Sequence, residues 1–356
     1  MNNQLQTKYS EVRNLFVNTP YLGLILNEIE SCRLDSLLGG EPDCMLITGS
    51  TGAGKTSLIQ RYLDIFPIEE KDTKTVVPVL YTTLPESASP ISASQQMLKD
   101  LNDPFYCTSN NAVLLSNRLV TLLKNCETKL IIIDEFQHMI ERRSSKVLFR
   151  AADWLKTLIV RSKVPVVMFG MPNSKHILES NSQLARRFLQ QRTLKPFRVI
   201  DEKERQFYLQ FLNEVDNALP FESPSQLASK SIALPLYAFC KGNMGRLRKL
   251  INFATKIALI EGHFKIEVTD FKKATESLLS EKFDNPFMLP LNKITYQEPK
   301  NQEDWDDYFE YDHPPQNSKN KVEQRLLLLA SELTSNELSL NDRAYNSTAV
   351  FKSNLH

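Results

Sequence analysis

The sequence predicts an α/β fold with a five-stranded parallel sheet, a small all-α unit and a largely disordered acidic tail. Short apolar runs alternate with amphipathic helical segments over residues 41–200, and the pattern is helical throughout residues 201–282. The stretch after residue 283 is rich in proline and asparagine, with little apolar periodicity. Strands that alternate with helices form a parallel sheet covered on both faces. We therefore expect an N-terminal helical segment (1–40), an α/β core (41–200), an α-helical lid (201–282) and a flexible, partner-binding tail (283–356).

Each expected element follows from a local pattern. The N-terminal segment carries apolar residues at helical spacing and is interrupted at Pro20. Short apolar runs predict strands at 44–48, 76–83, 130–133, 164–169 and 192–197. The helices expected between them are 57–66, 92–101, 111–125, 145–161 and 175–190, with a polar loop up to residue 74. The expected lid helices are 202–215, 224–240, 245–261 and 268–281.

The composition argues against several classes of protein. The 356 residues are 42% hydrophobic and 24% charged, which is typical of a globular chain, and the net charge is +1. The longest apolar runs are far shorter than the ~18–20 residues that span a bilayer. Five cysteines without a C-x-x-C pair indicate neither a disulfide framework nor a zinc site. Since the N-terminus also lacks signal-peptide features, we expect a soluble cytoplasmic protein with no membrane partner.

Charge is distributed unevenly along the chain. Residues 283–356 carry a net charge of −5, and the residues before them carry +6. This imbalance fits a body that meets a polyanion and a tail that meets another partner, although solvated surface explains it equally well. Two stretches of the tail stand out: the acidic-aromatic run 304–312, which suggests a partner motif, and a helix candidate at 322–333.

A glycine-rich stretch after the first strand matches the phosphate-binding pattern G-x-x-x-x-G-K-[ST] in full. It lies between an apolar strand and a helix, the context in which backbone N–H groups and a helix N-terminus bind phosphate. Lys55 would reach the β- and γ-phosphates, and the Thr56 hydroxyl would bind Mg²⁺. The expected nucleotide-binding residues are Gly49, Ser50, Thr51, Gly52, Ala53, Gly54, Lys55, Thr56 and Ser57.

Two carboxylates end the strand expected at 130–133. Asp134 would hold the metal, and Glu135 would polarise the water that attacks the γ-phosphorus. Because parallel strands end at one edge of a sheet, both side chains are expected beside the phosphate loop. A water-activating glutamate is typical of hydrolysing ATPases, so the pair predicts hydrolysis of ATP to ADP and phosphate.

Three further places could supply polar groups to the γ-phosphate. Asn173 follows the fourth expected strand, and Arg186 and Arg187 end the helix before the fifth. Arg246 and Arg248 follow a second glycine pair in the lid. Taken singly, an arginine on an amphipathic helix is more often solvated surface, and it is the order of these residues after the two phosphate motifs that favours a catalytic role.

In this order the motifs resemble those of the AAA+ ATPases, and in particular their initiator-like branch. Three stretches, 131–138, 169–173 and 184–188, are similar to the TniB/TnsC-type transposition ATPases of Tn7-like elements, and most of all to those that pair with a CRISPR effector. The resemblance covers about residues 15–280.

The resemblance implies an AAA+ P-loop core that binds ATP and Mg²⁺ and assembles on double-stranded DNA as a homo-oligomer, in rings or helical filaments. It also implies recruitment by a TniQ-type target selector and engagement of the TnsA and TnsB transposase subunits. Arg186 or Arg187 would act as an arginine finger on a neighbour's ATP. The lid arginine would be Arg246, although Gly245 leaves open whether Arg246 or Arg248 faces the phosphate.

Binding to DNA without sequence preference requires lysines and arginines on one exposed surface. The best local cluster follows the Asp-Glu strand, and two more basic residues precede it, although scattered surface charge remains the simpler interpretation of each. The candidates are Arg142, Arg143, Lys146, Lys99 and Arg118. Two other functions stay open: an ATP-dependent assembly scaffold with marginal hydrolysis, and a replication-initiator-like ATPase.

Overall fold

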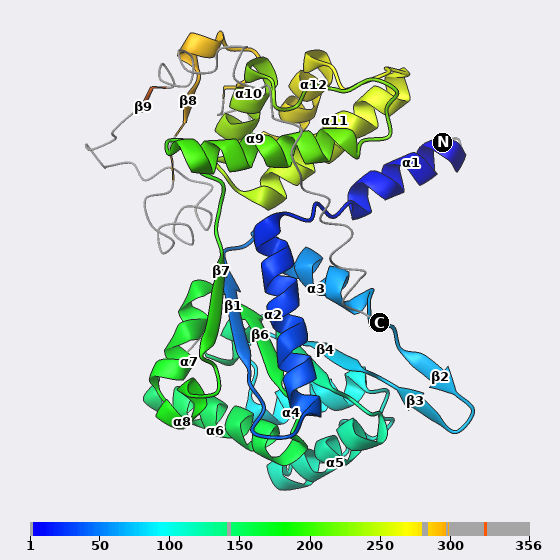
Figure 1. Cartoon of the computed structure of the whole chain (residues 1–356), viewed down its shortest axis with the longest axis vertical. Helices are drawn as coiled ribbons and strands as arrows, with labels where there is room; N and C mark the ends of the chain where they lie inside the picture. The colour runs from blue at the N-terminus through cyan, green and yellow to red at the C-terminus, as the bar shows by residue number, and fades with distance from the viewer. Residues whose placement is uncertain (1–2, 141–143, 280–283, 297, 299–323, 326–356) are drawn as a thin grey trace.

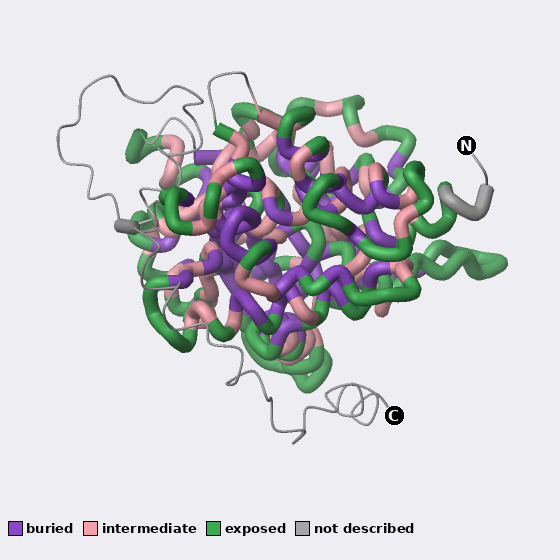
Figure 2. Tube along the Cα trace, turned by 90° about the horizontal axis from the view of Figure 1, so that it is seen from above, coloured by how far each residue is buried: buried purple, intermediate pink, exposed green. Residues whose placement is uncertain are grey.

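The computed structural model describes residues 3–140, 144–279, 284–296, 298 and 324–325. Figure 1 shows two stacked units, an α/β unit and a helical unit, with the long helix α2 (Pro20–Leu37) alongside the sheet. In Figure 2, seen from above, the buried residues gather in the middle of the molecule. The α/β architecture with a parallel sheet of five strands confirms the fold class predicted from the sequence.

The sheet has the strand order β4-β5-β6-β1-β7, and every neighbouring pair is parallel. Its strands are β1 (Met45–Gly49), β4 (Val79–Thr83), β5 (Leu130–Asp134), β6 (Val166–Gly170) and β7 (Gln190–Leu194). Strands β1, β5 and β6 are buried along their whole length, as expected for a sheet covered on both faces.

Alternate residues of each strand point to opposite faces of the sheet. Leu46, Ile131 and Met168 pack into the core that contains α4 (Pro90–Asp100), α5 (Ala112–Asn125) and α6 (Ser145–Ser162). Ile47, Ile132 and Phe169 pack into the opposite core, against α2 and α3 (Lys55–Leu63). The unit is thus a three-layer α/β/α sandwich.

Four local features differ from the sequence expectation. The expected polar loop up to residue 74 contains an exposed antiparallel hairpin of β2 (Glu69–Lys71) and β3 (Lys74–Val76), which projects from the core in Figure 1. The strand expected at 76–83 is divided because Pro78 has no N–H to donate to a ladder. The helix expected at 175–190 is divided into η2 (Pro172–Lys175), α7 (His176–Glu179) and α8 (Ser182–Ala185), since Asn181 caps a new start by accepting from Leu184 N at 3.0 Å. A 3-10 helix, η1 (Phe136–Met139), follows β5.

The helical unit consists of α9 (Glu202–Asn217), α10 (Lys230–Cys240), α11 (Met244–Glu261) and α12 (Val268–Leu278) around one apolar core. The helix expected from 224 begins only at Lys230. The reason is that the Asp216 carboxylate accepts from Ser225 N at 2.9 Å and Leu227 N at 3.2 Å, which holds this stretch in a turn.

Part of the predicted tail packs on the helical unit. Phe287 is buried and stacks on Phe271 with ring centroids 5.0 Å apart, and Tyr296 meets Tyr237 edge-on. This segment includes η3 (Leu291–Lys293) and β8 (Thr295–Tyr296), which pairs with β9 (Gln324–Arg325). Residues 284–296 therefore belong to the helical unit rather than to a flexible tail. The remainder of the predicted tail, including the run 304–312 and most of the helix candidate, lies outside the described residues.

The helix α1 (Asn3–Asn14) packs on the helical unit against α11. All five cysteines are unpaired, in agreement with the sequence expectation. Among the described residues, no helix combines the length and the apolar composition needed to cross a membrane.

Candidate functional site

The phosphate loop connects β1 to α3 and is held in a left-handed backbone conformation at two glycines. Gly52 has φ +76° and Gly54, which caps α3, has φ +94°. Side chains are strained at such angles, so glycine is required at both positions. Lys55 is buried at the start of α3, and its Nζ donates to the carbonyl oxygens of Gly49 at 2.5 Å and Ser50 at 3.1 Å. Its ammonium group is therefore held inside the loop, where a phosphate would lie.

The acidic pair lies at the same edge of the sheet, with β6 between β5 and β1. Asp134 is 3% exposed, and its Oδ1 accepts from Glu135 N at 2.8 Å. Burial is the main cause that raises the Asp134 pKa, and the charge of Glu135 adds to it. Glu135 itself has φ +54°, a left-handed conformation that costs a non-glycine residue about 1–3 kcal/mol.

Mg²⁺ prefers hard oxygen ligands, and two residues here fit it. Asp134 is a buried carboxylate whose charge is unfavourable without a cation, and Thr56 offers an exposed hydroxyl in the first turn of α3. Together they would hold the ion, which would supply charge neutralisation at the β- and γ-phosphates.

The end of β6 brings Asn173 to this edge. Its neighbour Met171 places its sulfur 3.9 Å from Lys55 Nζ and 3.8 Å from the Thr51 hydroxyl. Asn173 Oδ1 is buried and has no hydrogen-bond partner among the residues that the structure describes. An unpartnered amide beside a phosphate loop suits a ligand or a water molecule.

The lid docks directly on the phosphate loop through the second glycine pair. Asn243 caps α11, is 4% exposed, and donates from Nδ2 to Thr51 O at 2.8 Å. Gly245 N donates to Gly52 O, also at 2.8 Å. A Cβ on Gly245 would lie 2.9 Å from Gly52 Cα, so glycine permits this close approach of two backbones. The sequence indicated the glycine pair but not the role of Asn243, although an asparagine before a helix is a recognisable cap.

The two lid arginines have different surroundings. Arg248 points to the N-terminal segment, where Nη2 donates to Val12 O at 2.8 Å and Leu15 O at 3.3 Å. Burial lowers its pKa to about 10. Arg246 lies in the first turn of α11, with its guanidinium over the Phe239 ring. Arg246 thus follows Gly245, whose backbone meets the phosphate loop, and its side chain lies over Phe239, whereas the Arg248 side chain contacts the N-terminal segment.

Arg186 and Arg187 lie at the opposite end of β1 from the phosphate loop. Cys44 N, just before β1, donates to Arg187 O at 2.8 Å, whereas the loop begins after Gly49. Five residues of strand separate the two ends by about 16 Å. Arg187 is engaged in an ion pair with Glu41 at 3.0 Å and its side chain is 14% exposed, whereas Arg186 is exposed. Both line a pocket of about 450 Å³.

The DNA-binding candidates do not form a single described patch. Arg142 and Arg143 lie outside the described residues, and Lys146 is exposed in the first turn of α6. Arg118 forms an ion pair with buried Asp103, which lowers the Asp103 pKa, and Lys99 lies 6.0 Å from the Tyr106 ring centroid.

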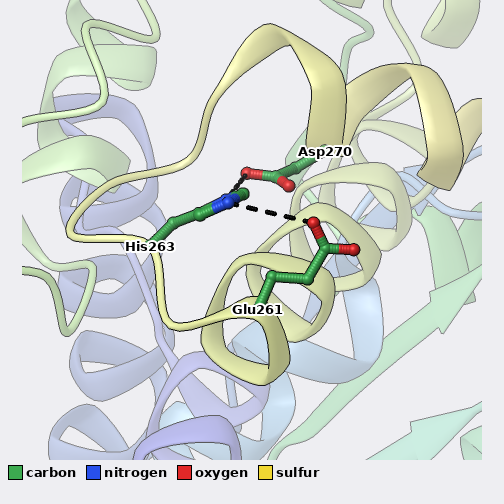
Figure 3. A group of neighbouring side chains, drawn as sticks. All are labelled: Glu261, His263 and Asp270. Atoms are coloured by element: carbon green, nitrogen blue, oxygen red, sulfur yellow. Dashed lines mark hydrogen bonds and ion pairs between the residues drawn. The ribbon is translucent and has the colours of Figure 1, made fainter.

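A second cluster of ionisable side chains lies in the lid at the junction of α11 and α12 (Figure 3). His263 Nδ1 lies 3.0 Å from Asp270 Oδ2, and Glu261 approaches the other ring nitrogen at 3.8 Å. Lys273 Nζ contacts both Glu261 oxygens, at 2.6 and 2.8 Å. The partners of Glu261 and His263 are thus side chains of the lid, and the cluster acts as a clamp between two helices.

A family of known proteins matches more than half of the chain. A family model described as "Bacterial TniB protein" matches residues 3–198. A comparison of the sequence with curated proteins finds no match.

Among solved structures, Cdc6p from Pyrobaculum aerophilum has a TM-score of 0.52 at 16% identity, covering 77% of this chain and 72% of that one. ORC2 from Aeropyrum pernix, solved as ADPNP-ADP complexes, has a TM-score of 0.53 at 16% identity, with 78% and 72% covered. At this identity the likeness shows the fold alone, that of an AAA+ ATPase.

Proposed function

The chain belongs to the TniB family, and on that premise we propose that it is an ATP-hydrolysing regulator of DNA transposition. It assembles on double-stranded DNA when ATP is bound, and it couples a TniQ-type target selector to the TnsA/TnsB transposase of a Tn7-like element. The observation that carries this proposal is the edge of the sheet where Lys55, Asp134, Glu135 and the docked lid meet.

At this edge each residue has a chemical task in ATP hydrolysis. Lys55 and the N-terminus of α3 bind the β- and γ-phosphates, and Asp134 with Thr56 holds Mg²⁺. Glu135 orients and polarises the attacking water, and Asn173 hydrogen-bonds that water or the γ-phosphate. Arg246 approaches the same phosphate from the lid.

The arginine finger acts between copies of the chain. Arg186 and Arg187 lie one strand length from the phosphate loop of their own chain, so they serve the ATP of a neighbour. Arg186 is the better finger because it is exposed, whereas Glu41 binds Arg187. ATP between subunits favours assembly, and loss of the γ-phosphate on hydrolysis loosens it.

Electron microscopy of the full chain with duplex DNA tests assembly, with ATP, ADP and a slowly hydrolysed analogue compared. We expect rings or filaments with ATP and the analogue, and dispersed protein with ADP. Protein that stays monomeric with ATP, Mg²⁺ and DNA would refute the proposal.

The variant Glu135→Gln separates a hydrolysing regulator from a passive scaffold. It should assemble on DNA, hydrolyse at least 100-fold more slowly and lose control of target choice in a transposition assay. Intact target choice in this variant would favour the scaffold function instead.

A further inference from the structure

One polar side chain at the catalytic edge has no task in the function proposed above. Gln137 lies in η1, two residues after Glu135, between Phe136 and His138. Phe136 and Met139 are buried in the core beneath, which fixes this short helix in place. Gln137 is half-buried and points back to the end of β6 and to Glu135.

The amide group of Gln137 makes two hydrogen bonds in different directions. Its Nε2 donates to Glu135 Oε2, and its Oε1 accepts from Met171 N at 3.1 Å. Met171 directly follows β6 and precedes Asn173 by two residues. One side chain therefore joins the water-activating carboxylate of Glu135 to the segment that carries Asn173.

The chemistry of the two partners suits an amide at this position. A carboxylate without a proton only accepts hydrogen bonds, and a backbone N–H only donates, so the group between them must offer one donor and one acceptor. Glutamine satisfies both and can be oriented in only one way. Glutamate would place an acceptor against Glu135, and methionine would offer neither bond.

We propose that Gln137 is a positioning residue for ATP hydrolysis, which holds Glu135 in its water-activating orientation and links it to the Asn173 segment. This inference rests on the proposed ATPase function and assigns a new residue to it. The bond to Glu135 Oε2 restricts the rotamers of a half-buried glutamate side chain and so fixes where its other oxygen points.

The test compares Gln137→Met and Gln137→Glu with the wild-type chain, bound to duplex DNA with ATP and Mg²⁺. Loss of a hydrogen bond to a charged group should lower kcat about 10- to 100-fold in Gln137→Met. The Kd for a fluorescent, slowly hydrolysed ATP analogue should stay within about twofold, because the hydrogen bonds of Gln137 are to Glu135 and Met171 and not to the phosphate loop. In Gln137→Glu, two adjacent carboxylates hold a proton to higher pH, so the acid limb of the kcat profile should move to higher pH.

Gln96→Met is the matched control. Gln96 also donates to a carboxylate, that of Asp100 at 2.8 Å, but it lies in α4, and its loss should leave kcat unchanged. A kcat of Gln137→Met equal to that of the wild type would overturn the positioning role. So would a variant that loses analogue affinity and melting temperature together with kcat. When the wild-type chain turns over ATP and Glu135→Gln does not, either of these results overturns the role of Gln137 and leaves the proposed function standing. A wild-type chain without turnover would overturn the proposed function as well.

Discussion

Replacing Gly245 with alanine is expected to weaken ATP binding about tenfold while leaving both units folded. The added Cβ would lie 2.9 Å from Gly52 Cα and 3.2 Å from Gly52 O. Carbon atoms in contact need about 3.5–4.0 Å, so the start of α11 must withdraw from the phosphate loop by about 0.6 Å or more. That movement breaks the bond from Gly245 N to Gly52 O and loosens the bond from Asn243 to Thr51.

The magnitude follows from these two contacts. Each hydrogen bond contributes about 0.5–1.5 kcal/mol, so the loss of both weakens the free energy of lid docking by about 1–3 kcal/mol. The equilibrium constant between docked and undocked lid then falls about 5- to 150-fold. Stability of the helix should not fall, because alanine in a helix is favoured over glycine by up to about 1 kcal/mol. The effect therefore concerns docking rather than folding.

Gly23→Ala is the matched control in the assay, which measures the Kd for a fluorescent ATP analogue together with the melting temperature. Gly23 lies inside α2, where a Cβ would meet Asn18 at an ordinary 3.5 Å. It should bind the analogue normally and melt slightly higher. Equal analogue affinity in Gly245→Ala and Gly23→Ala would show that lid docking is not coupled to ATP.

Three further outcomes are expected. Arg186→Ala should lower DNA-stimulated turnover of ATP by at least 100-fold. Mixing it with inactive Lys55→Ala should restore part of the rate, because the intact phosphate loop of one variant then meets the intact arginine of the other. No recovery would argue against action between copies. The Asp270 hydrogen bond raises the His263 pKa, so charged His263 stabilises the fold fully at pH values below the ordinary histidine pKa of about 6.5. That stability is lost as the pH rises through the higher pKa of the folded state. Denaturant titrations of His263→Gln should lack this pH dependence. Arg248→Met should destabilise the fold by about 1–3 kcal/mol, because Val12 O and Leu15 O lose their hydrogen-bond donor. Tryptic cleavage at Lys8 or Arg13 should then be faster. Unchanged cleavage would contradict the anchoring of α1.

Local patterns in the sequence were sufficient for the buried strands of the sheet and for the glycine-rich loop that follows β1. The strands β1, β5 and β6 are short apolar runs bounded by polar or glycine residues, and each is buried as predicted. The loop and the acidic pair are contiguous motifs, so their chemistry is visible without a structure. The family resemblance drawn from these motifs is confirmed by the match over residues 3–198.

What the sequence did not predict depends on contacts between distant residues. Asn243 meets Thr51 across 192 positions, and the Glu298 carboxylate accepts from Val199 N and Ile200 N across almost 100. The late start of α10 depends on Asp216, which belongs to the preceding helix. No local periodicity carries such information, and residues 284–296 resembled a tail because their apolar residues are irregularly spaced and interrupted by two prolines.

The positions of the lid and the arginines explain why one chain would not complete its own ATPase site. The lid reaches the phosphate loop at one end of β1 and closes that side with two hydrogen bonds of 2.8 Å, one from the Asn243 side chain and one from Gly245 N. Arg186 lies at the other end of the strand and extends into solvent, where only another molecule can present a phosphate. If the proposed ATPase site takes its arginine finger from a neighbouring copy, turnover depends on assembly, which is the dependence that the proposed regulator requires. The proposed ATPase activity should therefore rise steeply with protein concentration on DNA, and activity proportional to concentration would contradict a site shared between copies.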